Sequence, residues 1–248
     1  METNQNSVFL SMVIPAYNEE KILSESILKF DKFFSEKGYT YELIVIDDGS
    51  KDKTKEIALN LEKVVENFRL VSYEKNQGKG NAVKVGMLEA KGQFKLMADA
   101  DNSTPIEEID GFFPFFDEGY DVVVGSRIKG GRGENVKLEQ PLYRVMLAKS
   151  ANLIIRIMAV SGISDTQCGF KCFTSKAAEI IFPRLRIKRW GWDIEALAIA
   201  QRKDLKIKET PVDWFNRAES RVRPIKGAIT TLIELMKIKL NIIMGRYK

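Results

Sequence analysis

Two aspartates separated by one residue, Asp99 and Asp101, follow an apolar run that begins at Lys95. The run has the length and composition of a buried strand, and side chains two positions apart along a strand point the same way. The two carboxylates can therefore face one point just beyond the strand, where their like charges repel unless a cation lies between them. Magnesium or manganese bridging to a diphosphate fits such a point, because hard cations take carboxylate and phosphate oxygens. The alternative is an ordinary polar turn after a strand.

Two more polar segments follow apolar runs in the first half of the chain. They are residues 15–19 (Pro-Ala-Tyr-Asn-Glu) and residues 47–50 (Asp-Asp-Gly-Ser). Asp47, at a strand end, is placed to accept hydrogen bonds from a ribose or a base. Lys79, near the start of a helix, is placed to meet a base carbonyl or a phosphate. Residues 76–80 contain Gly-x-Gly but lack the Lys-Ser/Thr ending of a P-loop, which argues against a P-loop NTPase, and no dinucleotide fingerprint is present.

The chain of 248 residues contains no histidine and two cysteines. The lack of histidine excludes a Ser-His-Asp triad, a histidine general base and a histidine-ligated zinc. Cys168 and Cys172 cannot complete a zinc site or form a disulfide framework, so we expect a reducing, cytoplasmic setting. Proton transfer, where it is needed, falls to Asp, Glu, Lys or Tyr.

Strands and helices alternate four times before residue 125. Strands are predicted at residues 8–14, 43–46, 69–73, 95–98 and 122–124. Between them we expect a helix that Asn18 caps and Gly38 ends, a second helix to about residue 65, a third over residues 78–90, and a short one after Pro105. This order predicts an α/β fold with a mostly parallel, doubly wound sheet flanked by helices. Ligands bind at the carboxyl ends of the strands in such sheets, where the three polar segments lie.

The second half departs from this regular alternation. Residues 127–133 are glycine-rich and basic, which is typical of a loop. The apolar patterns that follow predict a long helix at 142–160, a strand at 168–173, a helix at 192–201, a strand at 205–214 and a last helix at 224–244.

Positive charge is concentrated at the C-terminal end. Residues 184–248 carry 16 Lys and Arg against 7 Asp and Glu, whereas the whole chain has a net charge of +5. This excess favours an anionic partner, such as phosphate groups or an acidic lipid surface, over a merely solvated basic face. Nucleic acid ranks last as a partner, because no basic-aromatic motif is present.

The last helix has two apolar faces with basic residues around them. The wider stripe contains Ile229, Leu232, Ile233, Met236, Leu240 and Ile243, and the narrower patch contains Leu235, Ile238 and Ile242. We expect one face to pack on the domain and the other to meet lipid, with lysines at the headgroups. The alternative is that both faces are buried in the core or in an oligomer interface. No apolar stretch is long enough to span a bilayer.

Several motifs together resemble glycosyltransferase family 2, whose fold is called GT-A. They are Val13 to Glu20, Asp47 to Asp52, Asn76 to Gly80 and Asp99-Ala100-Asp101. Asp165 to Lys171, Arg189 to Glu195, Val212-Asp213-Trp214 and Ser220-Arg221 narrow the resemblance to polyprenyl-phosphate glycosyltransferases, on the branch that holds the dolichyl-phosphate glucosyltransferases. The resemblance runs from about Met12 to Arg221, and the motifs keep their order. It implies a GT-A catalytic domain over residues 1–223, followed by an amphipathic helix over residues 224–248 at a membrane surface or interface.

The resemblance implies transfer of a hexose from a nucleotide-diphosphate sugar to a polyprenyl or dolichyl phosphate, with inversion and with Mg²⁺ or Mn²⁺ as cofactor. UDP-glucose is the donor we expect, and the alternatives are GDP-mannose, UDP-N-acetylglucosamine, another donor or a different acceptor. The implied nucleotide-binding residues are Pro15, Ala16, Tyr17, Asn18, Glu19, Asp47, Asp48, Lys79, Asp99 and Ala100. Asp99 and Asp101 are the implied metal ligands. A non-catalytic sugar-nucleotide-binding module is the competing hypothesis, and the intact pair of aspartates argues against it.

A phosphate acceptor is already largely ionised and needs positioning and charge relief more than a base. The candidates to bind it are Arg127, Arg132, Lys171, Arg189 and Arg221. The candidate catalytic carboxylates are Asp101, Asp165 and Asp193. The structural alternative for Asp165 is a turn cap, and for Asp193 an acid at a helix start. We expect the protein on the cytoplasmic face of a membrane, and the sequence leaves oligomerisation open.

Three features depart from the family pattern. Asn102-Ser103 replaces the residues that more usually follow the Asp-x-Asp, so a third protein ligand to the metal is not assigned. Glu219 stands where a glycine often precedes the Ser-Lys/Arg pair. The N-terminal membrane helix of the eukaryotic members is not seen in the sequence.

Overall fold

The computed structural model describes residues 8–127, 154–215 and 224–248, with side chains from residue 230 onward in the last range. Its strands form one sheet with the order β3-β2-β1-β4-β6-β5-β7. They are β1 (Leu10–Ala16), β2 (Tyr41–Asp47), β3 (Phe68–Ser72), β4 (Phe94–Ala98), β5 (Val122–Ser126), β6 (Phe170–Thr174) and β7 (Ile207–Pro211). Strands β1 to β4 pair in parallel, as β5 does with β7, while β6 runs antiparallel to both of its neighbours. The predicted mostly parallel α/β architecture is confirmed.

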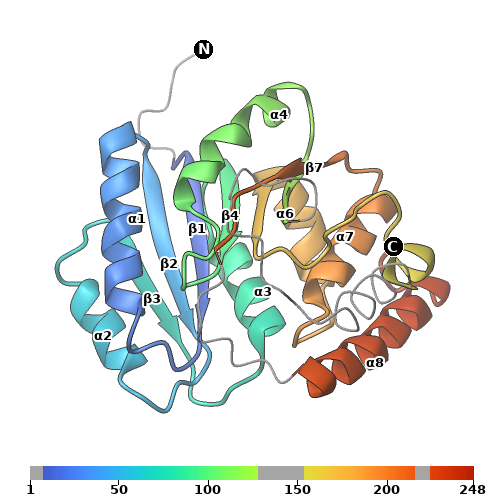
Figure 1. The fold of residues 1–248 in the computed structure, drawn as a ribbon, viewed down its shortest axis with the longest axis horizontal. Helices are drawn as coiled ribbons and strands as arrows, with labels where there is room; N and C mark the ends of the chain where they lie inside the picture. Colours follow the sequence, from blue (N-terminus) through green and yellow to red (C-terminus); the bar gives the residue numbers. More distant parts are fainter. Residues whose placement is uncertain (1–7, 128–153, 216–223) are drawn as a thin grey trace.

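Helices cover both faces of this sheet (Figure 1). They are α1 (Leu23–Lys37), α2 (Thr54–Leu61), α3 (Lys79–Glu89), α4 (Phe113–Asp117), α6 (Ser175–Ile181), α7 (Trp192–Arg202) and α8 (Pro224–Ile243), with 3₁₀ turns η1 (Ile106–Gly111) and η3 (Phe182–Arg184). Residues 154–158 are also helical, which covers the end of the helix predicted at 142–160; its other residues lie outside the described ranges. The sequence pattern did not reveal α6 or η3.

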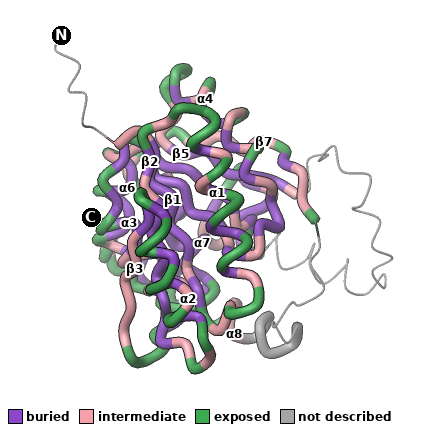
Figure 2. The backbone as a smooth tube through the Cα atoms, turned by 90° about the vertical axis from the view of Figure 1, so that its left-hand side faces the viewer, coloured by how far each residue is buried: buried purple, intermediate pink, exposed green. Residues whose placement is uncertain are grey.

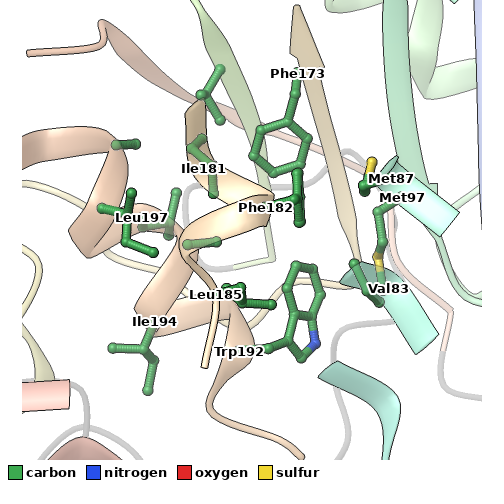
Figure 3. Packing of buried hydrophobic residues seen from close by; sticks show 14 of the residues in the cluster. Val83, Met87, Met97, Phe173, Ile181, Phe182, Leu185, Trp192, Ile194 and Leu197 are labelled. Atoms are coloured by element: carbon green, nitrogen blue, oxygen red, sulfur yellow. The ribbon is translucent and has the colours of Figure 1, made fainter. Parts of the chain in front are cut away.

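Each face of the sheet has its own hydrophobic core. One core joins the strands to α1, α2, η1 and α4, and includes Phe30 and Phe112. The other joins them to α3, α6, α7 and α8, and is centred on the fully buried Trp192. Figure 3 shows Trp192 near Val83 and Leu185, with Phe173 and Phe182 beyond. Burial follows the strands, while exposed residues gather on the outer helices (Figure 2). The central strands β1, β2, β4 and β6 are buried between the two cores, which fixes where their ends lie.

Helix α1 ends as predicted but does not begin as predicted. Gly38 adopts the left-handed conformation (φ 70°) that closes the helix, and its N–H donates to the carbonyl of Ser35. The helix begins at Leu23, and Asn18 does not cap it. Asn18 instead has a φ of 57°, and its side-chain oxygen accepts the N–H of Lys51 at 2.7 Å. The cap prediction is therefore wrong, because this asparagine joins two loops at the sheet edge.

Helix α8 packs beside α7 at the end of the molecule away from α1 and α2 (Figure 1). Its narrower apolar patch faces inward, where Leu235 is 2% exposed and Ile238 is fully buried. Most of the wider stripe faces outward, with exposed fractions between 49% and 70% for Leu232, Ile233, Met236, Leu240 and Ile243. Within the described ranges, no helix is both long and apolar enough to cross a membrane.

Candidate active site

Strand register brings the polar segments together at one edge of the sheet. Ala16, the last residue of β1, pairs with Asp47, the last residue of β2. Ala98, at the end of β4, pairs with Phe170 at the start of the antiparallel β6. The loops that begin at residues 17, 48 and 99, and the loop that ends at Gly169, therefore meet at this edge, as the sequence predicted for the first three.

Hydrogen bonds between neighbouring loops fix the segment after β1. The N–H of Asn18 donates to the Ser50 hydroxyl at 2.9 Å, and the N–H of Glu19 donates to the Thr54 hydroxyl at 2.7 Å. Pro15 and Ala16 belong to β1, and Tyr17 is 37% exposed. The structure thus places the predicted nucleotide-binding residues 15–19 beside the segment after β2.

Asp47 and Asp48 are buried and shape the loops around them. The Asp47 carboxylate accepts hydrogen bonds from the Ser50 N–H at 3.1 Å and the Ser72 hydroxyl at 3.0 Å. The Asp48 carboxylate accepts the N–H groups of Gln77 at 2.7 Å and of Gly78 at 2.8 Å. Asp48 therefore sets the conformation of the loop that leads into α3.

Lys79, at the start of α3, forms an ion pair with Asp99. Its Nζ lies 2.6 Å from Asp99 Oδ1 and 5.7 Å from the ring centre of Trp190. Burial lowers the pKa of Lys79, but the charges of Asp99, Asp193 and Asp101 outweigh it, so the pKa is raised above its usual value. Lys79 is therefore a full positive charge held against one of the two aspartates.

Gly169 gives Asp99 the room that it occupies. A Cβ at Gly169 would lie 2.1 Å from Asp99 Oδ2, so the carboxylate rests against the glycine backbone. Asp101 turns toward its own loop, and its Oδ1 accepts the Ser103 N–H at 2.9 Å. Asn102, which lies between Asp101 and Ser103, adopts the left-handed backbone conformation with a φ of 49°. Both aspartates therefore lie in the turn that follows β4 at the sheet edge, and their role as metal ligands stays a prediction.

Arg127 and Asp165, predicted for different roles, bind each other. Arg127 Nε and Nη2 each lie 2.8 Å from an oxygen of Asp165, whose Oδ2 also accepts the Arg127 N–H at 3.0 Å. Burial raises the pKa of Asp165, but the bonds and charge of Arg127 outweigh it, so the pKa stays below its usual value. Asp165 is therefore an ionised partner for Arg127, and its predicted catalytic role stays a prediction.

Lys171 and Asp193 form a second, deeper pair. The Lys171 side chain is fully buried in β6, and its Nζ donates to Asp193 Oδ1 at 3.0 Å and to the Cys168 carbonyl. Burial raises the pKa of Asp193, and the charges of Lys171 and Lys79 only partly offset this. Contact between Lys171 and an acceptor phosphate stays a prediction, and the observed geometry makes it a buried counter-ion for Asp193.

The remaining predicted cations differ in what can be said of them. Arg189 is exposed, in the segment that precedes α7, and its carbonyl accepts the Gly80 N–H at 3.2 Å. Arg189 thus lies beside the start of α3. Arg132 and Arg221 fall outside the described ranges, as do Glu219 and most of the glycine-rich loop.

The donor set at this edge fits a hard divalent cation. Asp99 and Asp101 supply carboxylate oxygens, and the ammonium group on Asp99 shows that the position accommodates a cation. Over the described ranges, no group of three or more His, Cys, Asp and Glu could enclose a metal alone, so other oxygens must complete its coordination. Nearby, the buried oxygens Asn102 Oδ1, Ser126 Oγ and Asp213 Oδ1 have no hydrogen-bond partner in the described part of the chain.

Sequence reasoning assigned no role to three residues next to the segment that precedes α7, although one of them, Glu195, belongs to a family motif. Glu195, Glu234 and Tyr247 are buried, and they bond to the segment before α7 or to each other. Glu234 could have been noticed in the sequence, because it stands next to the narrower apolar patch of α8, and a charged residue on an inward face needs a partner.

Known proteins resemble this chain over most of its length. Residues 11–179 match the family profile described as Glycosyl transferase family 2. A dolichyl-phosphate beta-glucosyltransferase of Trichomonas vaginalis is 37% identical over 247 residues, which span 98% of this chain and 76% of the relative. The Dictyostelium discoideum enzyme of the same name is 34% identical, with 98% and 77% covered, and the Homo sapiens enzyme is 32% identical, with 96% and 77% covered.

Solved structures share the fold at lower identity. Glucosyl-3-phosphoglycerate synthase from Mycobacterium tuberculosis, in complex with Mn²⁺, uridine-diphosphate-glucose and phosphoglyceric acid, superposes with a TM-score of 0.65 at 20% identity. The match covers 93% of this chain and 79% of that one. The same enzyme in complex with uridine diphosphate gives a TM-score of 0.64 at 21% identity, with 93% and 80% covered. These matches confirm the predicted GT-A fold.

Proposed function

The chain belongs to glycosyltransferase family 2, and from that premise we propose that it transfers glucose from UDP-glucose to the phosphate of a polyprenyl or dolichyl phosphate, with inversion at the sugar. It is a glycosyltransferase. The names of the relatives support glucose as the sugar and dolichyl phosphate as the acceptor. The uridine-diphosphate-glucose and Mn²⁺ in a structure of the same fold support the donor and a divalent metal.

The convergence of Lys79 and Asp99 at the sheet edge is the observation that carries the proposal. A cation and a carboxylate 2.6 Å apart, beside a second aspartate, suit a ligand that brings both a metal and negative oxygens. Asp99 and Asp101 would hold Mg²⁺ or Mn²⁺, which would neutralise the charge that develops on the departing nucleoside diphosphate. Lys79 adds a fixed positive charge at the same place.

The acceptor must approach the sugar from the face opposite the departing diphosphate, and its own phosphate oxygen is the nucleophile. Because a phosphate monoester is ionised near neutral pH, no histidine is required to deprotonate it. Arg127 is held in place by Asp165, yet 35% of its side chain is exposed. Arg127 and the exposed Arg189 are thus the described cations that we propose for the acceptor phosphate.

Helix α8 supplies a surface for the lipid part of the acceptor. Its outward stripe, described above, is apolar, and Lys237 and Arg246 lie on the same C-terminal segment. Apolar side chains that enter the headgroup region, with basic side chains at lipid phosphates, are the pattern of an interfacial helix. This pattern supports our proposal of peripheral contact with a membrane, and we propose its cytoplasmic face.

The test is transfer of labelled glucose from UDP-glucose to a short polyprenyl phosphate in detergent, with and without Mg²⁺ or Mn²⁺. GDP-mannose and UDP-N-acetylglucosamine are run in parallel as donors. Metal-dependent glucolipid that disappears in Asp101→Ala supports the proposal. Product from another donor overturns UDP-glucose alone. Absence of product from every donor, with nucleotide binding intact, favours a binding module or another acceptor.

The stereochemistry has its own readout. The anomeric configuration of the glucolipid is assigned by NMR from the coupling between the sugar protons. UDP-glucose carries an α-linked sugar, so inversion predicts a β-linked product. An α-linked product would overturn the inverting mechanism while leaving donor and acceptor in place.

A further inference from the structure

The segment between η3 and α7, residues 185–191, packs its backbone directly on the start of α3. The Gly80 N–H donates to the carbonyl of Arg189 at 3.2 Å, and the Asn81 N–H donates to that of Lys188 at 3.1 Å. A Cβ at Gly78 would lie 2.4 Å from the Lys188 oxygen. Lys79 lies between Gly78 and Gly80, so this close backbone contact fixes the position of Lys79 relative to Asp99 and Trp190. We call residues 185–191 the α3-contact loop.

Two buried carboxylates hold the α3-contact loop from its other side. Glu195 Oε2 accepts the N–H groups of Arg186 at 2.8 Å and of Ile187 at 2.6 Å. Glu234 Oε2 accepts the Gly191 N–H at 2.7 Å, and a Cβ at Gly191 would lie 3.0 Å from Glu234 Cβ. Three backbone amides of one short loop thus depend on two glutamates.

Both glutamates are tied to the C-terminal segment. Glu234 is part of α8, between the outward stripe and the buried Leu235. Glu195 Oε1 accepts the hydroxyl of Tyr247 at 2.6 Å, and that hydroxyl accepts Asn241 Nδ2 at 3.2 Å. Tyr247 is only 3% exposed, so this bond is shielded from water. The last helix and the last residues therefore form the support on which the loop rests.

We propose that Glu234 and Tyr247 are positioning residues, through which α8 holds the α3-contact loop where Trp190 and Lys79 meet. The donor-binding consequence rests on the proposed function, whereas the loop placement does not. Loss of the Glu234 carboxylate leaves the Gly191 N–H buried without its acceptor, which favours a loop that moves away from α3. Trp190 and Lys79 then lose their mutual contact near Asp99.

Amide hydrogen exchange of residues 186–191 and of the first turn of α3 tests the placement without any ligand. Glu234→Ala and Tyr247→Phe are compared with Glu234→Gln, whose amide oxygen can still accept the Gly191 N–H. Glu118→Ala and Tyr120→Phe, in the segment that leads into β5, are control substitutions of the same residue types. We expect exchange about tenfold faster in Glu234→Ala and Tyr247→Phe, and within about twofold of wild type in Glu234→Gln and in the controls. Unchanged exchange in Glu234→Ala and Tyr247→Phe would overturn the proposal.

Binding of UDP in the presence of Mn²⁺, measured by calorimetry, tests the consequence. We expect Kd to rise about tenfold in Glu234→Ala and to recover in Glu234→Gln. If Glu234→Ala only unfolds part of the protein, the number of binding sites falls while Kd stays at the wild-type value. That result would indicate a purely structural role and would count against the proposal. If the wild type binds no UDP, the proposed donor is wrong, and the exchange measurement alone decides whether α8 positions the loop.

Discussion

Replacing Asp193 by asparagine removes the carboxylate that neutralises Lys171. The Lys171 side chain is fully buried, and the Asp193 side chain is 9% exposed. Among the described residues, the ammonium also donates to the Cys168 carbonyl and lies 5.5 Å from the ring centre of Trp192. Neither carries a formal negative charge. The variant therefore leaves a cation inside the sheet with weak compensation.

The expected cost follows from that burial. Removing one partner of a buried ion pair destabilises a protein by about 3–5 kcal/mol, far more than the pair itself contributes relative to an apolar replacement. Asparagine keeps one oxygen acceptor, so we expect about 3 kcal/mol for Asp193→Asn and about 5 kcal/mol for Asp193→Leu. In a chain of this size about 3 kcal/mol lowers Tm by roughly 6–12 °C. The double variant Lys171→Met/Asp193→Leu has no buried charge, and we expect it to return to within about 1 kcal/mol of wild type.

Urea unfolding at neutral pH, followed by circular dichroism, measures these free energies. Asp110→Asn is the matched control, because Asp110 pairs with Lys37 where both side chains are about 40% exposed, and a surface pair is worth at most about 1 kcal/mol. A loss below about 1 kcal/mol in Asp193→Asn would refute the reasoning. So would a double variant as unstable as Asp193→Leu. The folded double variant then separates chemistry from stability, because retained glucosyl transfer would show that neither the Asp193 carboxylate nor the Lys171 ammonium takes part in the reaction.

Three further predictions address other parts of the site. Burial raises the pKa of Asp165, but its arginine partner brings it below 3.8, so this pair adds stability above about pH 4 that disappears as the pH falls through the folded-state pKa. In urea unfolding at neutral pH, Asp165→Asn should lower the free energy of unfolding by about 2 kcal/mol, because the arginine is partly exposed. This loss should shrink at about pH 3, and a loss that stays constant with pH would contradict the prediction. Gly169→Ala places a Cβ 2.1 Å from Asp99 Oδ2 and should weaken Mn²⁺-dependent UDP binding, measured by calorimetry, at least about tenfold. Gly111→Ala is the control, because its Cβ would meet no atom within 4 Å and should leave UDP binding unchanged. Leu240 is 49% exposed, so Leu240→Asp should keep Tm within about 2 °C of wild type. The same variant should sediment about tenfold less with anionic phospholipid vesicles, and sedimentation equal to that of wild type would argue against lipid contact through α8.

The first half of the fold could be predicted because its signals are local. Each predicted strand up to β5 and each helix between them is present, since periodicity and glycine positions are properties of short segments. The place of β6 could not be predicted. It enters the sheet between β4 and β5 and runs antiparallel, and this choice depends on packing among segments far apart in the chain. The start of α1 failed for the same reason, because Asn18 is satisfied by a backbone group 33 residues away.

Pairing within the site was also beyond sequence reasoning. Arg127 and Asp165 are 38 residues apart, and Lys171 and Asp193 are 22 apart, yet each pair satisfies its own charges. Read separately, the cations suggested phosphate contacts and the acids suggested catalysis. Residue type and spacing identified the acidic loops because strand ends in a parallel sheet share an edge. Which charges neutralise each other there depends on the tertiary structure.

The order of charges across the site explains how so many acids can lie together without destabilising the fold. Lys171 neutralises Asp193. Lys79 neutralises Asp99 and also interacts electrostatically with Asp193. Positive and negative groups thus alternate from the interior of β6 to the loop after β4, and Asp193 and Asp99 each have a cation beside them. A divalent ion at Asp99 must compete with the Lys79 ammonium for the same oxygen. A bound diphosphate removes that competition, because it gives Lys79 new anionic oxygens while it completes the coordination that two aspartates leave unfinished. On this argument metal and nucleotide bind cooperatively, and Mn²⁺ alone should bind more tightly to Lys79→Met than to wild type, because the variant frees Asp99 before any nucleotide arrives.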